Sequence, residues 1–202
     1  MKKNKISKNW INRQKRDIYV RKSKVEGYRS RAVYKLMELD QKFKIFRNGI
    51  SLVDLGSAPG SWTQYVLKKV KNAKILSIDL KEINKIENNF HIKGDFTEPK
   101  LQEEIKEYFN NKVDIVLSDM AANTTGNKYL DSLRTGELTL EAINFSKNIL
   151  KKEGKFISKV FMGSLFNEII VYARKSFKDV KVFKPLSSRK NSKENYIICT
   201  KY

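Results

Sequence analysis

Short apolar runs alternate with stretches in which apolar residues recur at helical spacing, and this alternation predicts an α/β fold. The apolar runs have the length of strands and end in turns or acidic residues. Strands are expected at 52–55, 75–80, 90–96, 113–120, 155–161, 180–183 and 194–200. Helices are expected over 31–47, from 62 onward, and over 99–109, 131–152 and 164–177.

We therefore predict a Rossmann-like, three-layer α/β sandwich. Its sheet has seven strands that are mostly parallel, and the last strand runs antiparallel in a closing hairpin. At 202 residues the chain is long enough for one domain with its own core. We place this domain at 31–202, behind a basic N-terminal arm over 1–30. Gly154, which follows two lysines and a glutamate, is expected to end the helix over 131–152.

One strand-turn-helix stretch has the composition of a ligand-binding turn. The apolar run 52–55 stops at Gly56, a Ser-Ala-Pro turn follows, and Gly60 precedes a helix. Glycine lets the backbone approach a ligand closely, and the start of a helix offers free N–H groups. Asp79 ends the next strand, about 20 residues on, where such folds hold a ribose diol. An ordinary tight turn has the same pattern, no P-loop Lys-Ser/Thr follows, and Asp54 fits a structural, turn-capping role.

The charge balance indicates a polyanionic partner. Lys and Arg number 42 against 22 Asp and Glu, which gives a net charge of +20. Nucleic acid fits this excess better than a membrane does, although a lysine-rich source composition would also raise the charge. In the arm over 1–30, cations are interleaved with aromatic residues, as in segments that stack on RNA bases. Such a run is also typical of a solvated, frayed tail.

The rarity of cysteine and histidine disfavours several kinds of site. A single cysteine, Cys199, excludes a disulfide framework and a Cys-based zinc site, and its apolar surroundings predict a core residue. The single histidine, His91, has no second His or Cys to join it, so we expect no metal. No apolar run approaches membrane-spanning length, and no apolar region follows the basic N-terminus as in a secretory signal. We expect a cytoplasmic monomer without membrane contact.

Charged residues are placed where predicted strands end. Asp79, Asp95 and Asp119 each end a parallel strand, so they should line the edge that carries the glycine turn. Lys159 lies on a neighbouring strand, where a central position buried on both faces makes charge costly. Glu194 begins the last strand and reaches the same edge if that strand runs antiparallel. Together these residues form an acid/base set without histidine, cysteine or metal ligands.

The set belongs to a pattern that resembles the FtsJ/RrmJ family of S-adenosylmethionine-dependent RNA ribose 2′-O-methyltransferases. The matching motifs follow the family's order over nearly the whole chain: Arg29-Ser30-Arg31-Ala32, Asp54-Leu55-Gly56-Ser57-Ala58-Pro59-Gly60-Ser61-Trp62, Gly94-Asp95-Phe96, Ser118-Asp119-Met120-Ala121, Lys159-Val160-Phe161, and Ser187-Ser188-Arg189 with Glu194 and Tyr196. Together these motifs are specific, although none is specific alone. Two departures lie beside the site, with Ala122 in place of proline and Ser61 in place of a second glycine.

The resemblance implies a class I methyltransferase fold, S-adenosylmethionine as cofactor, and a catalytic tetrad of Lys35, Asp119, Lys159 and Glu194. It also implies the cofactor-binding residues, which are Gly56, Gly60, Trp62, Asp79, Asp95 and Asp119. Of these, Asp79 would hold the ribose diol and Asp95 the adenine, with Gly60 and Trp62 near the sulfonium. The similarity is greatest to bacterial members that act on a uridine of 23S rRNA, so ribosomal RNA or the large ribosomal subunit is the expected partner.

The implied reaction needs a 2′-hydroxyl aligned with an electrophilic methyl group and relieved of its proton. Lys159 is the expected base, because a buried strand, the second cation Lys35 and the sulfonium charge all favour a neutral amine. Asp119 would orient this amine, and Glu194 would hold Lys35 or the ribose. Three alternatives stay open: a tRNA or cap ribose methyltransferase, a non-catalytic ribosome-assembly RNA-binding protein, and a small-molecule methyltransferase, which the charge disfavours.

Overall fold

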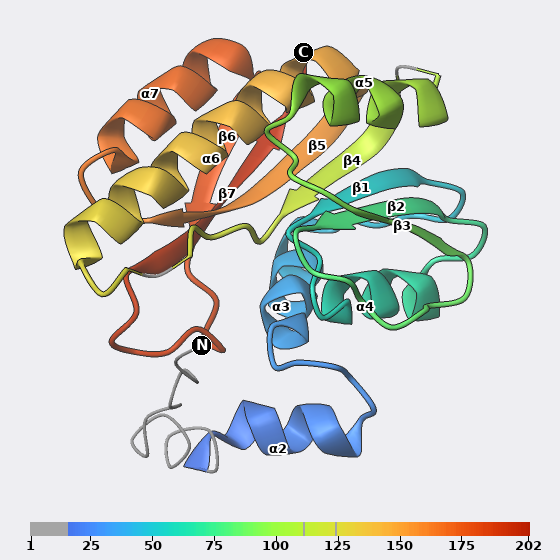
Figure 1. Cartoon of the computed structure of the whole chain (residues 1–202), viewed down its shortest axis with the longest axis horizontal. Helices are drawn as coiled ribbons and strands as arrows, with labels where there is room; N and C mark the ends of the chain where they lie inside the picture. Colours follow the sequence, from blue (N-terminus) through green and yellow to red (C-terminus); the bar gives the residue numbers. More distant parts are fainter. Residues whose placement is uncertain (1–15, 111, 124) are drawn as a thin grey trace, which may run out of the picture.

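The computed structural model describes residues 16–110, 112–123 and 125–202. At its centre lies a seven-stranded sheet in the order β3-β2-β1-β4-β5-β7-β6 (Figure 1). The strands are β1 Ser51–Leu55, β2 Lys74–Asp79, β3 Asn89–Lys93, β4 Val113–Ser118, β5 Leu150–Phe161, β6 Asp179–Phe183 and β7 Glu194–Thr200. The other six strands point the same way, and β7, between β5 and β6, runs in the opposite direction. The predicted fold class is confirmed.

Helices cover both faces of the sheet. One face carries α3 (Val33–Phe43) and α4 (Ser61–Lys69), and the other carries α5 (Pro99–Tyr108), α6 (Lys128–Ile149) and α7 (Phe166–Ser176), as Figure 1 shows. Alternate side chains of a strand serve the two layers. In β4, Val116 packs with α5, α6 and α7, whereas Ile115 and Leu117 pack with α3 and α4. Because both layers bury the central strands, these strands are mostly apolar in the sequence, and the charged residues Asp54, Asp114 and Lys159 are exceptions within them.

The junction between α6 and β5 differs from the prediction. The sequence predicts a helix over 131–152, but β5 already begins at Leu150. This prediction is wrong because Leu150 pairs with Val113 in the parallel ladder, a contact that the local pattern does not reveal. Gly154 lies inside β5 and ends no helix. A Cβ at Gly154 would lie 3.0 Å from the carbonyl oxygen of Asp114, so glycine is needed for the close approach of β4.

The helix predicted over 31–47 is also shorter than expected. It ends at Phe43 because Lys44 adopts the left-handed conformation, with φ of 48°. Beyond that point the carboxylate of Asp40 accepts the Ile45 N–H at 3.0 Å, which replaces the helical hydrogen bond. The side chain of a helix residue, rather than a glycine or proline, therefore redirects the chain toward β1.

The described part of the predicted arm is folded against the domain. Helix α2 (Ile18–Val25) is capped by the carboxylate of Asp17. The same carboxylate forms ion pairs with Arg31, just before α3, and with Arg189 in the loop between β6 and β7. The description of a frayed tail is therefore wrong for this part. The rest of the arm, 1–15, lies outside the described residues, and the boundary between arm and domain remains a prediction.

Candidate active site

The ends of the parallel strands and the start of β7 meet at one edge of the sheet. Leu55, the last residue of β1, pairs with Ile78 of β2 on one side and with Ser118 of β4 on the other. Phe161, at the end of β5, pairs with Glu194 at the start of β7. The edge predicted from the sequence therefore brings the acidic strand ends and the glycine turn together.

Two ion pairs lie at this edge, and each joins a buried residue to a half-buried one. The ammonium of Lys159 lies 3.1 Å from Asp119 Oδ1 and donates to the Asp119 backbone carbonyl at 2.5 Å. The ammonium of Lys35 lies 2.8 Å from Glu194 Oε2. Lys159 is only 6% exposed and Glu194 only 8%, and charges so removed from water are costly unless they are paired. The structure thus brings the four residues of the predicted tetrad together as two pairs.

Tyr196 joins the two pairs. Its hydroxyl donates to Asp119 Oδ1 at 2.9 Å, and the Lys35 ammonium lies 5.9 Å from the centre of its ring. Burial, together with the nearby carboxylates of Asp119 and Glu194, raises the pKa of Tyr196 well above its ordinary value, so the hydroxyl stays a donor. Tyr196 belongs to a motif that carries the family resemblance, but no role for it is predicted from the sequence. The available indication was its position two residues after Glu194, on the same face of the strand.

Asp119 is an ionised acceptor at neutral pH. Burial alone would raise its pKa, but the ammonium groups of Lys159 and Lys35 and the hydroxyl of Tyr196 lower the pKa below its ordinary value. An ionised carboxylate can only accept hydrogen bonds. Asp119 is therefore suited to orient the amine of Lys159 rather than to donate a proton.

The loop between β6 and β7 is fastened over the pair formed by Lys35 and Glu194. Within this loop, the hydroxyl of Ser188 donates to Glu194 Oε1 at 2.8 Å. The carboxylate of Glu38, three residues after Lys35 on α3, accepts two backbone N–H groups of the loop at 2.5 and 2.8 Å. The guanidinium of Arg31 donates to a loop carbonyl. These contacts tie α3 to the loop and fix the orientation of both members of the pair.

The turn between β1 and α4 is a cradle that larger residues would fill. Gly56 has φ of 72° and Gly60 has φ of 101°, a region that glycine adopts without strain. A Cβ at Gly56 would lie 2.8 Å from Met120, which follows β4. A Cβ at Gly60 would lie 2.8 Å from the side chain of Ile86, which follows β2. The glycines therefore allow three segments of the sheet edge to meet around one turn.

The carboxylates of Asp79, which ends β2, and Asp95, two residues beyond the end of β3, are held in fixed orientations beside this cradle. Asp79 accepts the Ala58 N–H of the turn at 2.9 Å through Oδ2. Asp95 accepts the N–H and the hydroxyl of Thr97 through Oδ1, at 2.9 and 2.7 Å. A carboxylate has about four acceptor sites, so both groups can accept further hydrogen bonds from a ligand.

The side chains of Trp62 and Asp54, on either side of the turn, lie too deep for a ligand to reach. Trp62 is 2% exposed and its indole N–H donates to the Ala32 carbonyl at 2.8 Å, so a ligand could contact only its main chain. Asp54 accepts the Thr63 hydroxyl at 2.8 Å, in keeping with a structural role. However, Asp54 Oδ1 and Ser57 Oγ are buried without a partner in the part of the chain that the structure describes. Of these two atoms, only the Ser57 hydroxyl belongs to the turn itself, where a polar ligand in the cradle could satisfy it.

The described residues hold neither a metal-ligand cluster nor a membrane-spanning helix. Over residues 16–110, 112–123 and 125–202, no three His, Cys, Asp or Glu side chains gather where they could hold a metal ion. His91 is hydrogen-bonded to Ser77 Oγ at 3.1 Å, and Cys199 is a buried core residue. No helix within these ranges is long and apolar enough to cross a bilayer.

The site lies within a sequence match that decides the family. Residues 28–202 match the FtsJ-like methyltransferase family, and this range holds all four members of the two ion pairs and the glycine turn. The chain belongs to the FtsJ-like methyltransferase family. The resemblance inferred from the motifs is confirmed, and the chain is an enzyme of the methyltransferase class.

Curated FtsJ-like methyltransferases resemble the chain along its whole length. It is 63% identical over 199 residues to the ribosomal RNA large subunit methyltransferase E of Pelagibacter ubique, and the match covers 98% of both chains. It is 46% identical to the protein of the same name from Rickettsia akari, over 95% of this chain and 87% of that one. The similarity therefore extends well beyond the motifs of the site.

Solved structures share the fold of this FtsJ-like methyltransferase. A crystal structure described as a ribosomal RNA methyltransferase from Plasmodium falciparum is 35% identical, with a TM-score of 0.78 over 87% of this chain and 98% of that chain. Human methyltransferase-like protein 13, crystallised with SAH, is 14% identical, with a TM-score of 0.58 over 76% and 72% of the two chains. The second likeness shows the fold alone.

Proposed function

We propose that this FtsJ-like methyltransferase transfers a methyl group from S-adenosylmethionine to a ribose 2′-hydroxyl of large-subunit ribosomal RNA. The observation that carries the proposal is the buried pair of Lys159 and Asp119, 3.1 Å apart, at the sheet edge beside the glycine turn. Relatives named for large-subunit rRNA methylation, one of them 63% identical, support the substrate. The net charge of +20 suits a polyanion. We infer a uridine of 23S rRNA as the target and a monomer acting in the cytoplasm.

The cofactor would lie in the glycine cradle. The proposed cofactor-binding residues are Gly56, Gly60, Trp62, Asp79, Asp95 and Asp119. Asp79 would accept hydrogen bonds from the ribose diol and Asp95 from the adenine amine. The hydroxyl of Ser57, buried without a partner among the described residues, is available to a polar group of the ligand. When bound, S-adenosylmethionine supplies a methyl group on a sulfonium that is already strongly electrophilic.

The two ion pairs would act on the ribose. The transfer requires the 2′-oxygen to be aligned and to lose its proton. Lys159 is the proposed base, because Asp119 holds its amine through both the carboxylate and the backbone carbonyl, at the sheet edge where the ribose would lie. Glu194 holds the ammonium of Lys35 in place beside this site, at 2.8 Å.

The proposal is tested with purified protein and methyl-labelled S-adenosylmethionine. Large ribosomal subunits, small subunits and bulk tRNA are offered separately, and cofactor binding is measured alongside. We expect label in large-subunit RNA alone. Label in tRNA would contradict the proposed substrate and favour a tRNA ribose methyltransferase. Absence of label in all three RNAs, with the cofactor still bound, would contradict the proposed activity.

Replacing Arg29 by methionine is expected to weaken cofactor binding about 10-fold. The Arg29 guanidinium donates to the carbonyls of Pro59, Asn84 and Lys85 at 3.0, 2.8 and 3.0 Å, and so holds the segment after β2 against the glycine turn. A charged hydrogen bond contributes about 1.5 kcal/mol or more, which is roughly a factor of 10 in affinity. Calorimetric titration with S-adenosylmethionine measures the loss.

The matched control is Arg21→Met, which removes an exposed arginine from α2. Its cofactor affinity should equal that of the unchanged protein, while the turnover of Arg29→Met should recover at saturating cofactor. Equal cofactor affinities in all three proteins would show that the hydrogen bonds of Arg29 to these carbonyls have no part in cofactor binding.

A further inference from the structure

A second hollow lies beside the ion pairs, away from the glycine cradle. It is a cavity of about 730 Å³, within the size range of small-molecule sites. Its walls come from residues next to the proposed catalytic groups: Ala121 follows Asp119 by two positions, Phe161 follows Lys159 by two, and Lys193 precedes Glu194. The lining residues place this hollow at the ends of β4, β5 and β7, whereas the cradle is centred on the turn after β1, between the ends of β2 and β4.

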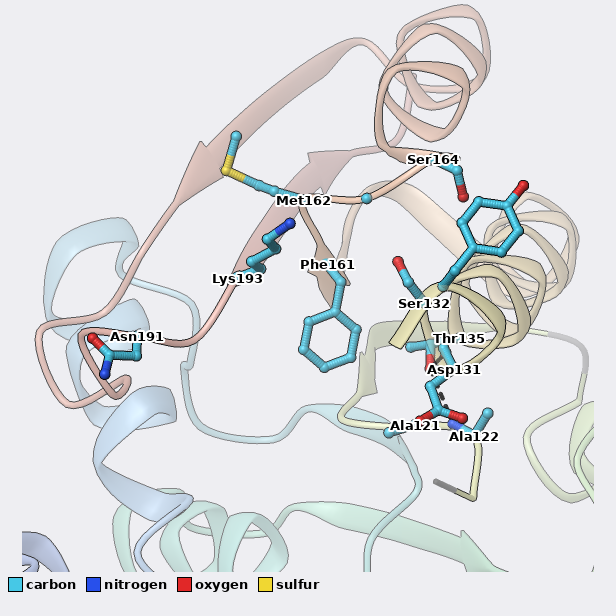
Figure 2. A pocket seen from close by; sticks show the side chains of 12 residues that line it. Ala121, Ala122, Asp131, Ser132, Thr135, Phe161, Met162, Ser164, Asn191 and Lys193 are labelled. Carbon is cyan, nitrogen blue, oxygen red and sulfur yellow. Dashed lines mark hydrogen bonds between the residues drawn. The ribbon is translucent and has the colours of Figure 1, made fainter. Parts of the chain in front are cut away.

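The hollow has aromatic and apolar walls with a polar side. Figure 2 shows the ring of Phe161 projecting between the start of α6, with Ser132, and the loop that carries Asn191 and Lys193. Tyr129, on α6, also lines it and is 62% exposed. A planar, apolar ligand with polar edges would stack on the rings and hydrogen-bond to the amide of Asn191.

The wall formed by α6 is held open by fixed contacts. The hydroxyl of Thr135 accepts the Ala122 N–H at 3.1 Å and donates to the Asp131 carbonyl at 2.8 Å, so the segment after β4 is fastened to α6. Gly163, at the other rim, packs closely against Ser132 of α6, so that a Cβ there would require the serine hydroxyl to move. The hollow is therefore a built feature of the fold and not a gap between loose loops.

We propose that this hollow receives the base of the nucleotide that is methylated, turned out of its stack and resting on Phe161. The inference rests on the proposed function, because it requires the target 2′-hydroxyl at Lys159. In a nucleotide the base is bonded to C1′, the neighbour of the carbon that carries this hydroxyl, so the base must lie beside the ion pairs. The cradle side is taken by the cofactor, and the hollow is the aromatic surface on the other side. A base turned out of its stack is commonly held by such stacking.

The test is a double-mutant cycle between the RNA and the protein. One RNA fragment carries the natural target nucleotide, and a second keeps the ribose but lacks its base. Both are methylated by the unchanged enzyme and by Phe161→Ala, and kcat/KM is measured. We expect loss of the base or loss of the ring to cost about 10-fold to 100-fold each. The two losses together should cost little more than either one, because each removes the same stacking contact.

Phe161→Leu keeps the apolar contacts of the strand and loses the ring, so it replaces the alanine variant if that variant does not fold. Phe90→Ala is the matched control, because Phe90 is 51% exposed on β3, at the far edge of the sheet. In this variant, removing the base from the RNA should lower kcat/KM as much as it does in the unchanged enzyme. If the unchanged enzyme methylates the natural fragment but the kcat/KM losses from removing the base and from replacing Phe161 are fully additive, the base site is overturned. The proposed function would still stand. Failure of the unchanged enzyme to methylate the natural fragment or large subunits would overturn both.

Discussion

Replacing Lys159 by alanine is expected to lower methyl transfer by about 100-fold to 10,000-fold, the range that a positioned general base contributes. Its amine lies 3.1 Å from Asp119 and is only 6% exposed, so neither water nor another lysine can easily take its place. Cofactor affinity should change much less than turnover, because Lys159 contacts only Asp119 among the six proposed cofactor-binding residues. Initial rates at saturating cofactor and a cofactor titration measure the two effects separately.

Two further variants separate proton transfer from charge. Lys159→Arg keeps a cation beside Asp119, but a guanidinium stays protonated and cannot act as a base. It should be nearly as inactive as the alanine variant. Lys152→Ala, which removes an exposed lysine from the same strand, should keep full activity. A Lys159→Arg enzyme with normal turnover would show that Lys159 acts through its charge alone.

Asp54 is expected to make the protein less stable as the pH rises. Burial, reinforced by the negative charges of Asp119 and Asp79 and opposed by the Thr63 hydrogen bond, raises the pKa of Asp54 to about 7. From about pH 4 to about pH 7 the folded state holds a proton that the unfolded state has released, so the free energy of unfolding falls across this window. The loss amounts to roughly 4 kcal/mol, at 1.36 kcal/mol for each pH unit.

Denaturant unfolding at pH 5 and pH 8 measures this contribution in Asp54→Asn, whose amide does not titrate. The variant should lose most of the difference in unfolding free energy between the two pH values. Glu103→Gln, which removes a carboxylate whose side chain is 63% exposed, should keep the difference in full. The same pH difference in Asp54→Asn and in the unchanged protein would assign the effect to other groups.

The sheet and its functional edge could be predicted because they follow from local periodicity. Buried parallel strands are read from uninterrupted apolar runs, and the residues that end such strands must meet at one edge. Asp79, Asp95 and Asp119 could therefore be grouped, and Lys159 could be singled out as a charge in a buried strand. Lys35 could be placed on its helix face, but the family resemblance was needed to join it to the others.

The remaining features depend on contacts between distant parts of the chain. Glu38 holds a loop 148 residues away, and the amphipathic pattern of α3 gives no indication of this contact. Arg29 and Asp17 lie in a basic stretch whose composition is equally typical of a tail. The early start of β5 at Leu150 is fixed by pairing with Val113, which only the folded sheet makes possible.

The most direct measurement of the central claim determines which atom of the RNA receives the methyl group. Large-subunit RNA labelled by the purified enzyme is hydrolysed in alkali, which cleaves next to a free 2′-hydroxyl and spares the bond beside a methylated one. We predict that the label is recovered in alkali-resistant dinucleotides and is lost with Lys159→Ala. Label recovered in mononucleotides would place the methyl group on a base and would contradict the account of the site.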